Sequence, residues 1–300
     1  MSIEIKDLKK QYKNHVVLDG INMTFKKPGI YLIAGPNGSG KTTLLELIIG
    51  LRKPTSGNIK INGYLPDSAD AKKELGFLSQ QNSLRKNCKV SEELDLVSEI
   101  FGIREIDLEK YLEKFDLRQY YHHKTRKLSG GSKRRLLLAM TLLPKQKVIV
   151  LDEPASGLDS FSRNEIWNII TEISKDRIVI VSDHYLNQAA QYSDYVYLMD
   201  KGRIALHGHI DVVTSSLKKT HVIKVREGKH VEIEKQLQKL GFVVDLKISG
   251  TVYSYYLNVT DIAKLNQLDV KEAHLDVINF EDVYFYYTGK YSHDGGDSHA

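Results

Sequence analysis

The chain has one cysteine, no long apolar run and no sustained heptad repeat. A single cysteine, Cys88, excludes an intrachain disulfide and fits a reducing compartment. No stretch approaches the ~20 apolar residues that a membrane-spanning helix needs. Residues 1–6 alternate like a strand and lack the apolar core of a signal peptide. With 41% hydrophobic and 27% charged residues, the chain is expected to be a cytosolic globular protein.

The net charge of +5 raises the question of an anionic partner. Basic residues are scattered along the chain, with one denser stretch at residues 118–135. We interpret most of this stretch as the solvated face of a helix, with attraction to a membrane or a phosphate as the alternative. No nucleic-acid partner is expected.

A phosphate-binding loop is the strongest local motif. In residues 35–42 (GPNGSGKT), two glycines five apart are followed by Lys-Thr. The apolar run 29–34 before it predicts a buried strand, and residues 43–49 predict a helix. Such a turn aims backbone N–H groups and the positive end of the helix at one point, where a triphosphate binds. Lys41 would reach the β- and γ-phosphates, and Thr42 would ligate Mg²⁺. The predicted nucleotide-binding residues of the loop are Asn37, Gly38, Ser39, Gly40, Lys41, Thr42 and Thr43.

A second motif is the apolar run 148–151, which ends in the carboxylates Asp152 and Glu153. It predicts a strand that brings charge to the edge of a parallel sheet, where such folds bind ligands. Asp152 suits the Mg²⁺ shell, and Glu153 is placed to orient or deprotonate an attacking water. The alternative is a solvated acidic pair at a strand end, which the phosphate-binding loop upstream makes the weaker interpretation.

The third motif is LSGGS at residues 128–132, which precedes a helical run. It resembles the signature of the ATP-binding cassette (ABC) ATPases. A hydroxyl N-cap and two glycines at a helix N-terminus form a second anion-binding surface. In that family the signature of one subunit closes over the ATP of the other, so the resemblance implies a homodimer or heterodimer. The predicted nucleotide-binding residues here are Ser129, Gly130 and Gly131.

Four further positions match the family in order along the chain. Tyr12 matches the aromatic residue on which adenine stacks, and Gln80 matches the glutamine that contacts Mg²⁺ and links the site to a membrane subunit. Residues 156–159 resemble the loop that crosses the dimer interface. His184 resembles the histidine that holds the γ-phosphate. The resemblance therefore implies Glu153 and His184 as catalytic residues, with ATP and Mg²⁺ as cofactors. The implied metal ligands are Thr42, Gln80 and Asp152.

Three positions depart from the pattern. Ser132 replaces the usual glutamine, so no role of that glutamine is transferred to it. Asp183 stands before His184 where a hydroxyl residue is more usual, and its carboxylate could hydrogen-bond the imidazole or raise its pKa. The Gln80-Gln81 doublet leaves two candidates, of which we favour Gln80.

The resemblance implies an α/β fold: an ABC cassette with a mixed sheet core and an N-terminal antiparallel β subdomain. We expect this ATPase domain at residues 1–211. The family inserts a helical subdomain, here about residues 82–140, in which Ser91 opens a helix as a hydroxyl cap and 107–115 is a second helix. This subdomain forms a groove for a cytoplasmic helix of the membrane subunit, and residues 82–90 are the candidate contact.

A small α+β accessory domain is expected at residues 212–290, followed by a disordered tail at 291–300. The order β-α-β-β-α-β predicts a ferredoxin-like module. Its predicted strands are 222–227, 242–249, 251–258 and 270–278, and its predicted helices are 229–240 and 261–268.

The final segment, residues 280–289, resembles the closing helix of ABC ATPases that serve exporters of drugs and antimicrobial peptides. A generic amphipathic helix is the alternative. We therefore expect the ATP-hydrolysing subunit of a bacterial exporter of a peptide, drug or other amphiphile. It would lie on the cytoplasmic face of the membrane, with the transmembrane permease on a separate chain. The alternatives are an importer ATPase and a soluble ABC ATPase that acts on a ribosome or DNA.

Overall fold

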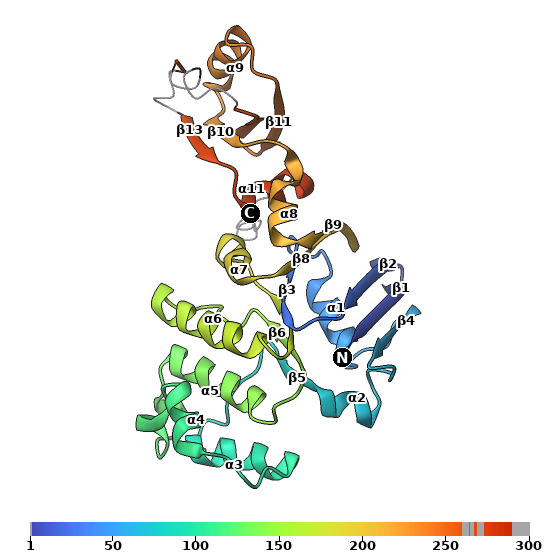
Figure 1. The fold of residues 1–300 in the computed structure, drawn as a ribbon, viewed down its shortest axis with the longest axis vertical. Helices are drawn as coiled ribbons and strands as arrows, with labels where there is room; N and C mark the ends of the chain where they lie inside the picture. Colours follow the sequence, from blue (N-terminus) through green and yellow to red (C-terminus); the bar gives the residue numbers. More distant parts are fainter. Residues whose placement is uncertain (1, 260–263, 265–266, 269–272, 290–300) are drawn as a thin grey trace.

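The computed structural model describes residues 2–259, 264, 267–268 and 273–289. Figure 1 shows a cassette built around a central sheet, with a helical subdomain at one end and an accessory sheet at the other. No described helix has both the length and the apolar character needed to cross a membrane.

The central sheet has six strands in the order β5-β6-β7-β3-β8-β9. Five strands run parallel, and β9 pairs antiparallel with β8. The three inner strands β3, β6 and β7 are buried along their whole length because helices and a second sheet cover the two faces. The bounds are β3 Gly29–Ala34, β5 Leu75–Leu78, β6 Val148–Asp152, β7 Ile178–Ser182, β8 Tyr195–Asp200 and β9 Arg203–His209.

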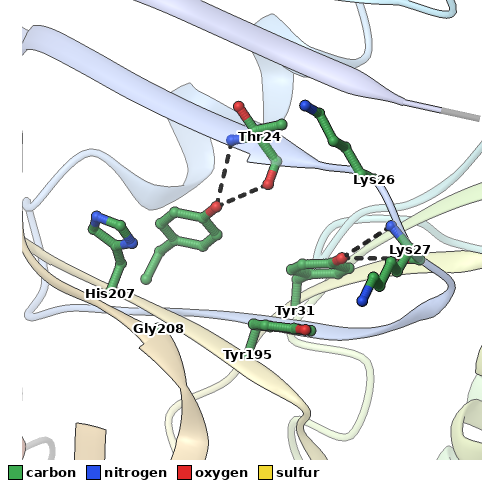
Figure 2. Close-up of a pocket in the computed structure, with 8 residues that line it drawn as sticks. Thr24, Lys26, Lys27, Tyr31, Tyr195, His207 and Gly208 are labelled. Atoms are coloured by element: carbon green, nitrogen blue, oxygen red, sulfur yellow. Dashed lines mark hydrogen bonds between the residues drawn. The ribbon is translucent and has the colours of Figure 1, made fainter. Parts of the chain in front are cut away.

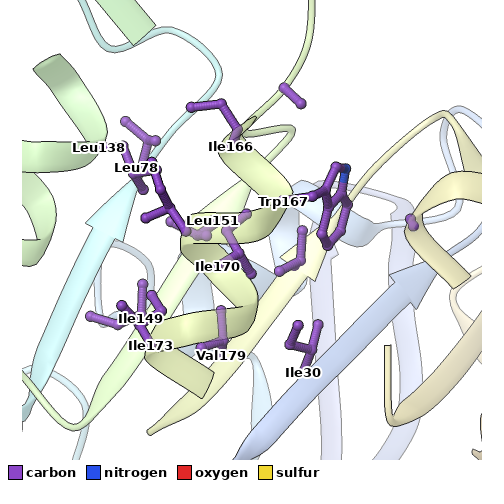
Figure 3. Packing of buried hydrophobic residues seen from close by; sticks show 14 of the residues in the cluster. Ile30, Leu78, Leu138, Ile149, Leu151, Ile166, Trp167, Ile170, Ile173 and Val179 are labelled. Carbon is purple, nitrogen blue, oxygen red and sulfur yellow. The ribbon is translucent and has the colours of Figure 1, made fainter. Parts of the chain in front are cut away.

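One face of this sheet packs against α6 (Ser160–Ser174), as Figure 3 shows. Ile166, Trp167 and Ile170 of α6 point onto the strands. Trp167 is fully buried, and its ring stacks on Tyr192 with centroids 5.3 Å apart. Tyr192 ends α7 (Leu186–Tyr192), the helix that follows β7. This core therefore reaches the segment after β7, where a predicted site residue lies.

The other face packs against α1 (Lys41–Ile48) and a three-stranded antiparallel sheet in the order β2-β1-β4. Its strands are β1 Ile3–Tyr12, β2 His15–Phe25 and β4 Ser56–Ile61, and α2 Ala69–Glu74 leads into β5. Phe25 contacts Tyr31 of β3 edge-on, with centroids 4.9 Å apart. This sheet is the predicted N-terminal antiparallel subdomain.

The helical subdomain holds α3 Val90–Phe101, α4 Leu108–Lys114 and α5 Gly130–Leu142, with short 3-10 turns Arg118–Tyr120 and Thr125–Lys127. The predicted hydroxyl cap at Ser91 is wrong, because α3 begins at Val90 and its N-cap is Lys89, two residues before Ser91. The Glu92 carboxylate accepts the Lys89 backbone N–H at 2.9 Å. At α4 the side chain of Asp107 is the N-cap, so the helix lies within the predicted range 107–115.

The accessory sheet has four antiparallel strands in the order β11-β12-β10-β13. The first and third strands of the domain lie at its centre, as a ferredoxin-like order requires. The bounds are β10 His221–Arg226, α9 His230–Lys239, β11 Val244–Ser249, β12 Val252–Leu257 and β13 Ala273–Val277. The predicted helix 261–268 and the tail 291–300 fall largely or wholly outside the described residues.

The short helix α8 (Ile210–Thr214) and the 3-10 turn Ser215–Leu217 lead from the cassette to the accessory sheet. The last helix, α11 (Phe280–Thr288), packs between the two parts. Phe280, Val283 and Tyr284 belong to the core beside α6 and α7. Phe285 packs instead with Tyr256 of the accessory sheet. The final helix therefore contributes to both hydrophobic cores.

Candidate functional site

The loop between β3 and α1 has the geometry of a phosphate-binding turn. Gly40 caps α1 with a φ of 101°, which favours glycine. A Cβ at Gly35 would lie 2.6 Å from the backbone oxygen of Met199, so this position also requires glycine. Lys41 is 8% exposed, and its Nζ donates to the carbonyls of Gly35 (2.7 Å) and Pro36 (3.2 Å). The lysine is thus folded back along its own loop.

A cavity of about 510 Å³ gathers most of the predicted nucleotide site. The Ser39 hydroxyl, inside the loop, is buried and has no hydrogen-bond partner in the described part of the chain. The residues that line the cavity are His15, Val17, Asn37, Gly38, Gly40, Lys41, Thr42, Thr43, Gln80, Glu153 and His184. These donors and the basic Lys41 fit a triphosphate.

Glu153 is held from two sides. Gln80 Nε2 donates to Glu153 Oε2 at 2.7 Å, and His184 Nε2 pairs with Glu153 Oε1. The residue is 7% exposed and has a φ of 50°, an uncommon value for a side chain of this size. The hydrogen bond to Glu153 raises the pKa of the His184 imidazole. Gln80 and His184, from the segments after β5 and β7, therefore both bond the carboxylate of Glu153, which follows β6.

Asp152 lies one residue earlier, at the buried end of β6. The Ser182 hydroxyl donates to its Oδ1, and the same hydroxyl accepts the Glu153 backbone N–H at 3.2 Å. Burial raises the pKa of Asp152, while hydrogen bonds from Ser182 and Thr42 oppose the shift. Burial also lowers the pKa of Lys41, and the charges of Glu153 and Asp152 oppose that change. The carboxylate and Thr42 thus lie together, as Mg²⁺ binding requires.

Arg134 is a site residue that the sequence interpretation missed. It was assigned to a solvated basic face, which is wrong at this position, because Arg134 is 8% exposed. Its guanidinium donates to the carbonyls of Pro154 (2.6 Å), Glu153 (2.8 Å) and Asp152 (3.2 Å). A further bond reaches Ser79 O at 3.3 Å. Arg134 therefore ties the signature helix to the catalytic strand and to the residue before Gln80.

The role suggested for Asp183 needs a partial correction. Its Oδ1 accepts the Tyr185 backbone N–H at 2.8 Å, and the imidazole of His184 bonds Glu153 instead. The charge of Asp183 also raises the His184 pKa, but less than Glu153 does. Ser182, one residue earlier, supplies the site's hydroxyl group and was not predicted. A hydroxyl residue at the end of a buried strand was the available signal.

The signature residues do not line the cavity. Ser129 caps α5, and its hydroxyl accepts the Ser132 N–H at 3.1 Å. A Cβ at Gly130 would meet no described atom within 4 Å, and its φ is not positive. Within the described residues, neither packing nor backbone conformation therefore requires glycine there. Ser132, assigned no role, is buried, and its hydroxyl accepts from the Ser129 hydroxyl at 3.0 Å.

Tyr12 also lies outside the residues that line the cavity. It ends β1 and pairs in the hairpin with His15, which does line it. Lys10 Nζ lies 4.8 Å and Arg52 Cζ 5.5 Å from the centre of its half-exposed ring. Two cations therefore already contact this ring.

Figure 2 shows a second cavity, of about 280 Å³, near the start of β3. The nucleotide cavity lies beyond the end of the same strand. Tyr31 stacks on Tyr195 with centroids 5.0 Å apart. The hydroxyls of Tyr31 and Tyr197 donate to the carbonyls of Lys27 and Thr24, each at 3.0 Å. These bonds tie the end of β2 to the central sheet, so we assign this cavity's tyrosines a structural role.

Comparison with known proteins agrees with this geometry. The family model described as "ABC transporter" matches residues 18–156. The lantibiotic transport ATP-binding protein SrtF of Streptococcus pyogenes is 30% identical over 210 residues, which cover 70% of this chain and 91% of SrtF. The chain belongs to the ABC transporter family. Its ABC ATPase domain, predicted from the motifs, is confirmed.

Longer relatives contain this ABC domain as one part. ATP-binding cassette sub-family A member 13 of Homo sapiens is 35% identical over 215 residues, 69% of this chain but 4% of that protein. The "Probable multidrug ABC transporter ATP-binding protein YbhF" of Escherichia coli (strain K12) is 33% identical over 216 residues, 37% of its length. The chain thus spans only a small part of these two relatives.

Solved structures confirm the cassette fold. An ATP-binding subunit of an ABC transporter superposes with a TM-score of 0.67 at 25% identity, covering 73% of this chain and 94% of that one. A dimeric ATP-binding cassette in a post-hydrolysis state, bound to ADP and Pi, has a TM-score of 0.62 at 25% identity. It covers 69% of this ABC chain and 98% of its own.

Proposed function

We propose that this chain is the ATP-hydrolysing subunit of a bacterial ABC exporter whose permease is a separate chain. The proposal of ATP hydrolysis rests on the position of the Glu153 carboxylate. Gln80 and His184 both bond it, and it lies in the same cavity as Lys41. The general base of a hydrolase must lie where a water can reach the phosphate.

The residues divide the work as follows. Lys41 and the backbone N–H groups of residues 37–43 hold the phosphates. Thr42, Gln80 and Asp152 would hold Mg²⁺, which when bound neutralises charge on the phosphate oxygens. Glu153 orients the water and accepts its proton, and His184 holds the γ-phosphate. Tyr12 stacks on adenine once Lys10 and Arg52 rearrange.

A dimer completes the proposed site. Ser129 and Gly130 are exposed, and the open space at Gly130 leaves room for a phosphate brought by a second subunit. The N-terminus of α5 lies at the same place, and a helix N-terminus favours an anion. The loop at residues 156–159 crosses the same interface. Identical and related partner subunits both satisfy this arrangement.

The membrane partner has a candidate docking groove. A cavity of about 420 Å³ lies in the helical subdomain and includes part of the predicted contact, residues 82–90. Leu84 and Leu137 give it an apolar lining, and three cations line it as well. Such a groove fits an amphipathic segment that carries acidic residues. The lining residues are Asn82, Ser83, Leu84, Lys86, Thr125, Arg126, Lys133 and Leu137.

Movement in this groove can reach the catalytic base. Gln80 lies two residues before the groove and bonds Glu153, while Arg134 bonds Ser79 from the neighbouring helix. A permease segment that moves the groove would therefore move Gln80 and Arg134, which both bond Glu153.

The exporter direction rests on two observations. The helix at residues 280–289 resembles that of exporter ATPases. The relative SrtF is named a lantibiotic transport protein, and YbhF is named a probable multidrug transporter protein. An importer ATPase and a soluble ABC ATPase are the competing functions. We divide the chain at about residue 211 into the ATPase domain and the accessory domain, and place it on the cytoplasmic face of the membrane.

The test is affinity purification of the full chain from detergent-solubilised cells, with co-purifying proteins identified by mass spectrometry. Recovery of a polytopic membrane protein supports the transporter function, and that protein's own sequence separates export from import. A variant with Lys86→Glu and Arg126→Glu should lose the membrane protein yet keep ATP binding. Recovery of ribosomal or DNA-bound proteins instead would overturn the proposal.

A further inference from the structure

In the described part of the chain, β11 is an edge strand of the accessory sheet. Among the described residues, β11 pairs only with β12. All six of its residues are in register, from Val244 opposite Leu257 to Ser249 opposite Val252, with no bulge. A regular edge strand presents a row of backbone N–H and C=O groups to any further strand. Bulges and prolines, which commonly block such pairing, are absent from this strand.

Apolar side chains are exposed along this edge. Leu246 is 40% exposed and Ile248 52%, and Val243, just before the strand, is 80% exposed. Leu246 and Ile248 lie opposite Tyr255 and Tyr253, so they project on the α9 face of the sheet. The apolar stripe that packs against α9 near the centre of the sheet therefore continues to the β11 edge, where its side chains are partly exposed.

The charged residues of β11 alternate with these apolar ones on the face toward α11. Asp245 accepts from the Tyr286 hydroxyl at 3.3 Å and lies 3.1 Å from Lys219 Nζ. Lys247 Nζ lies 4.5 Å from the centre of the Tyr286 ring. One acidic and one basic residue therefore flank Leu246 on either side, and both are held in place.

This arrangement is self-complementary. If β11 is placed antiparallel to a second β11 about a two-fold axis at Leu246, each Asp245 faces the Lys247 of the other strand. Val244 then faces Ile248, and the two Leu246 side chains meet at the axis. Directly opposite residues in an antiparallel pair contact each other, and opposite charges there stabilise the pair. Shifting the register by one residue would place Asp245 opposite Leu246 and lose these contacts.

We propose that β11 pairs with β11 of a second copy of this chain, joining the two accessory sheets into one. The interface is isologous, so one surface supplies both halves. Backbone hydrogen bonds would hold the pair, and the apolar and charged contacts would set its register. The pairing does not depend on ATP or on the transport function.

Cysteine cross-linking tests the register. Residues directly opposite have Cβ atoms about 4.5–5.5 Å apart, close to the ~3.5–4.5 Å of a disulfide. The L246C substitution, made with Cys88→Ser in the full chain without nucleotide, should give a covalent dimer on oxidation. The matched control is V277C, because Val277 is 69% exposed in β13 at the opposite edge of the same sheet. The proposal would be overturned if L246C gave no covalent dimer, or if V277C gave as much covalent dimer as L246C.

A charge swap tests the complementarity without a cross-link. By sedimentation of the nucleotide-free chain, D245K should weaken self-association by about tenfold or more. The double variant D245K/K247D should recover it, because each new lysine again faces an aspartate. Circular dichroism checks that both variants fold, and L246K against V277K repeats the test on the α9 face. Unchanged association in D245K and L246K would exclude this pairing, and leave a strand from another protein or the β13 edge as the occupant.

Discussion

Asn187 and Glu281 exchange two hydrogen bonds between the cassette and the last helix. Asn187 Oδ1 accepts the Glu281 backbone N–H at 2.9 Å, and Asn187 Nδ2 donates to Glu281 Oε2 at 3.2 Å. Asn187 lies in the first turn of α7, three residues after His184. The N-terminus of α11 is therefore held close to His184, which bonds the proposed base Glu153.

The first prediction removes this pair of bonds. Asn187→Ala should lower the free energy of unfolding by about 1–2 kcal/mol, because the Glu281 N–H at a helix N-terminus loses its acceptor. Asn187→Asp is the matched variant, since it keeps that acceptor but places a carboxylate against Glu281. Urea denaturation measures both. If Asn187→Ala is as stable as the native chain, the two bonds do not contribute to holding α11.

The second prediction concerns the base. Glu153→Gln keeps the size of the side chain but cannot accept a proton, so hydrolysis should fall by about 10²-fold or more while ATP binding is retained. Steady-state phosphate release and equilibrium binding of a fluorescent ATP analogue measure the two properties. The variant should also accumulate as an ATP-bound dimer. Rapid turnover by Glu153→Gln would refute the assignment of the base.

The third prediction concerns the lysine that we propose binds the phosphates. Lys41→Ala removes its cation, and charge-assisted bonds from such a cation contribute about 1.5–3 kcal/mol. Nucleotide affinity should therefore fall by about tenfold or more. The control is Lys13→Ala in the β1–β2 turn, which changes the same charge outside the residues that line the cavity. Equal affinities in native and Lys41→Ala chains would count against this site.

The fourth prediction follows from the raised pKa of His184. A histidine with a raised pKa in the folded state stabilises the fold fully below its unfolded value of about 6.5. That contribution disappears as the pH rises through the folded pKa. The stability difference between the native chain and His184→Gln should therefore shrink as the pH increases above 6.5.

Two buried carboxylates near His184 also have shifted pKa values. Burial raises the pKa of Asp152 and that of Asp183, and both residues are present in both proteins, so the test compares the two proteins at each pH. Urea denaturation between pH 5.5 and pH 9 measures the difference. A constant difference across that range would show that the Glu153–His184 pair does not stabilise a charged imidazole.

The sequence predicted the contacts of this site that join neighbouring residues better than those that join residues far apart in the chain. The phosphate-binding loop was found because Gly40, Lys41 and Thr42 are consecutive and their geometry is local. Arg134 was misread, because its neighbours Lys133 and Arg135 made it look like part of a solvated face. Its guanidinium donates to backbone carbonyls, and every residue has one, so the sequence does not show which carbonyls Arg134 bonds.

The accessory domain shows the same limit. Alternating apolar residues predicted its strands, and the strand order followed from the order of elements. The contact between Asn187 and Glu281, 94 residues apart, depends on how α11 docks. Two polar residues on different helices carry no pattern that pairs them. The prediction of the α3 cap failed for a similar reason. The helix begins with Lys89 as its N-cap, and the Glu92 carboxylate accepts the Lys89 N–H, so Ser91 is not the cap.

The last prediction concerns a buried ion pair that anchors α11 on the accessory sheet. Lys224 Nζ of β10 lies 2.6 Å from Asp282 Oδ1, and Asp282 is fully buried. The other carboxylate oxygen accepts the Asn279 N–H at 3.0 Å and caps the helix. Lys224→Met leaves the carboxylate buried without this cation, which should cost about 3 kcal/mol or more.

The double variant Lys224→Met/Asp282→Asn should regain most of that loss, because the neutral amide keeps an acceptor for the Asn279 N–H. The exposed pair Lys147–Asp176 provides the control, since Lys147→Met should change stability by about 1 kcal/mol at most. Trp167, the only tryptophan, reports on the cassette core by its fluorescence, and far-UV circular dichroism reports on both parts. Because α11 packs into both cores, the two signals should shift together in Lys224→Met. A shift in circular dichroism alone would show that the accessory domain unfolds without loosening the cassette.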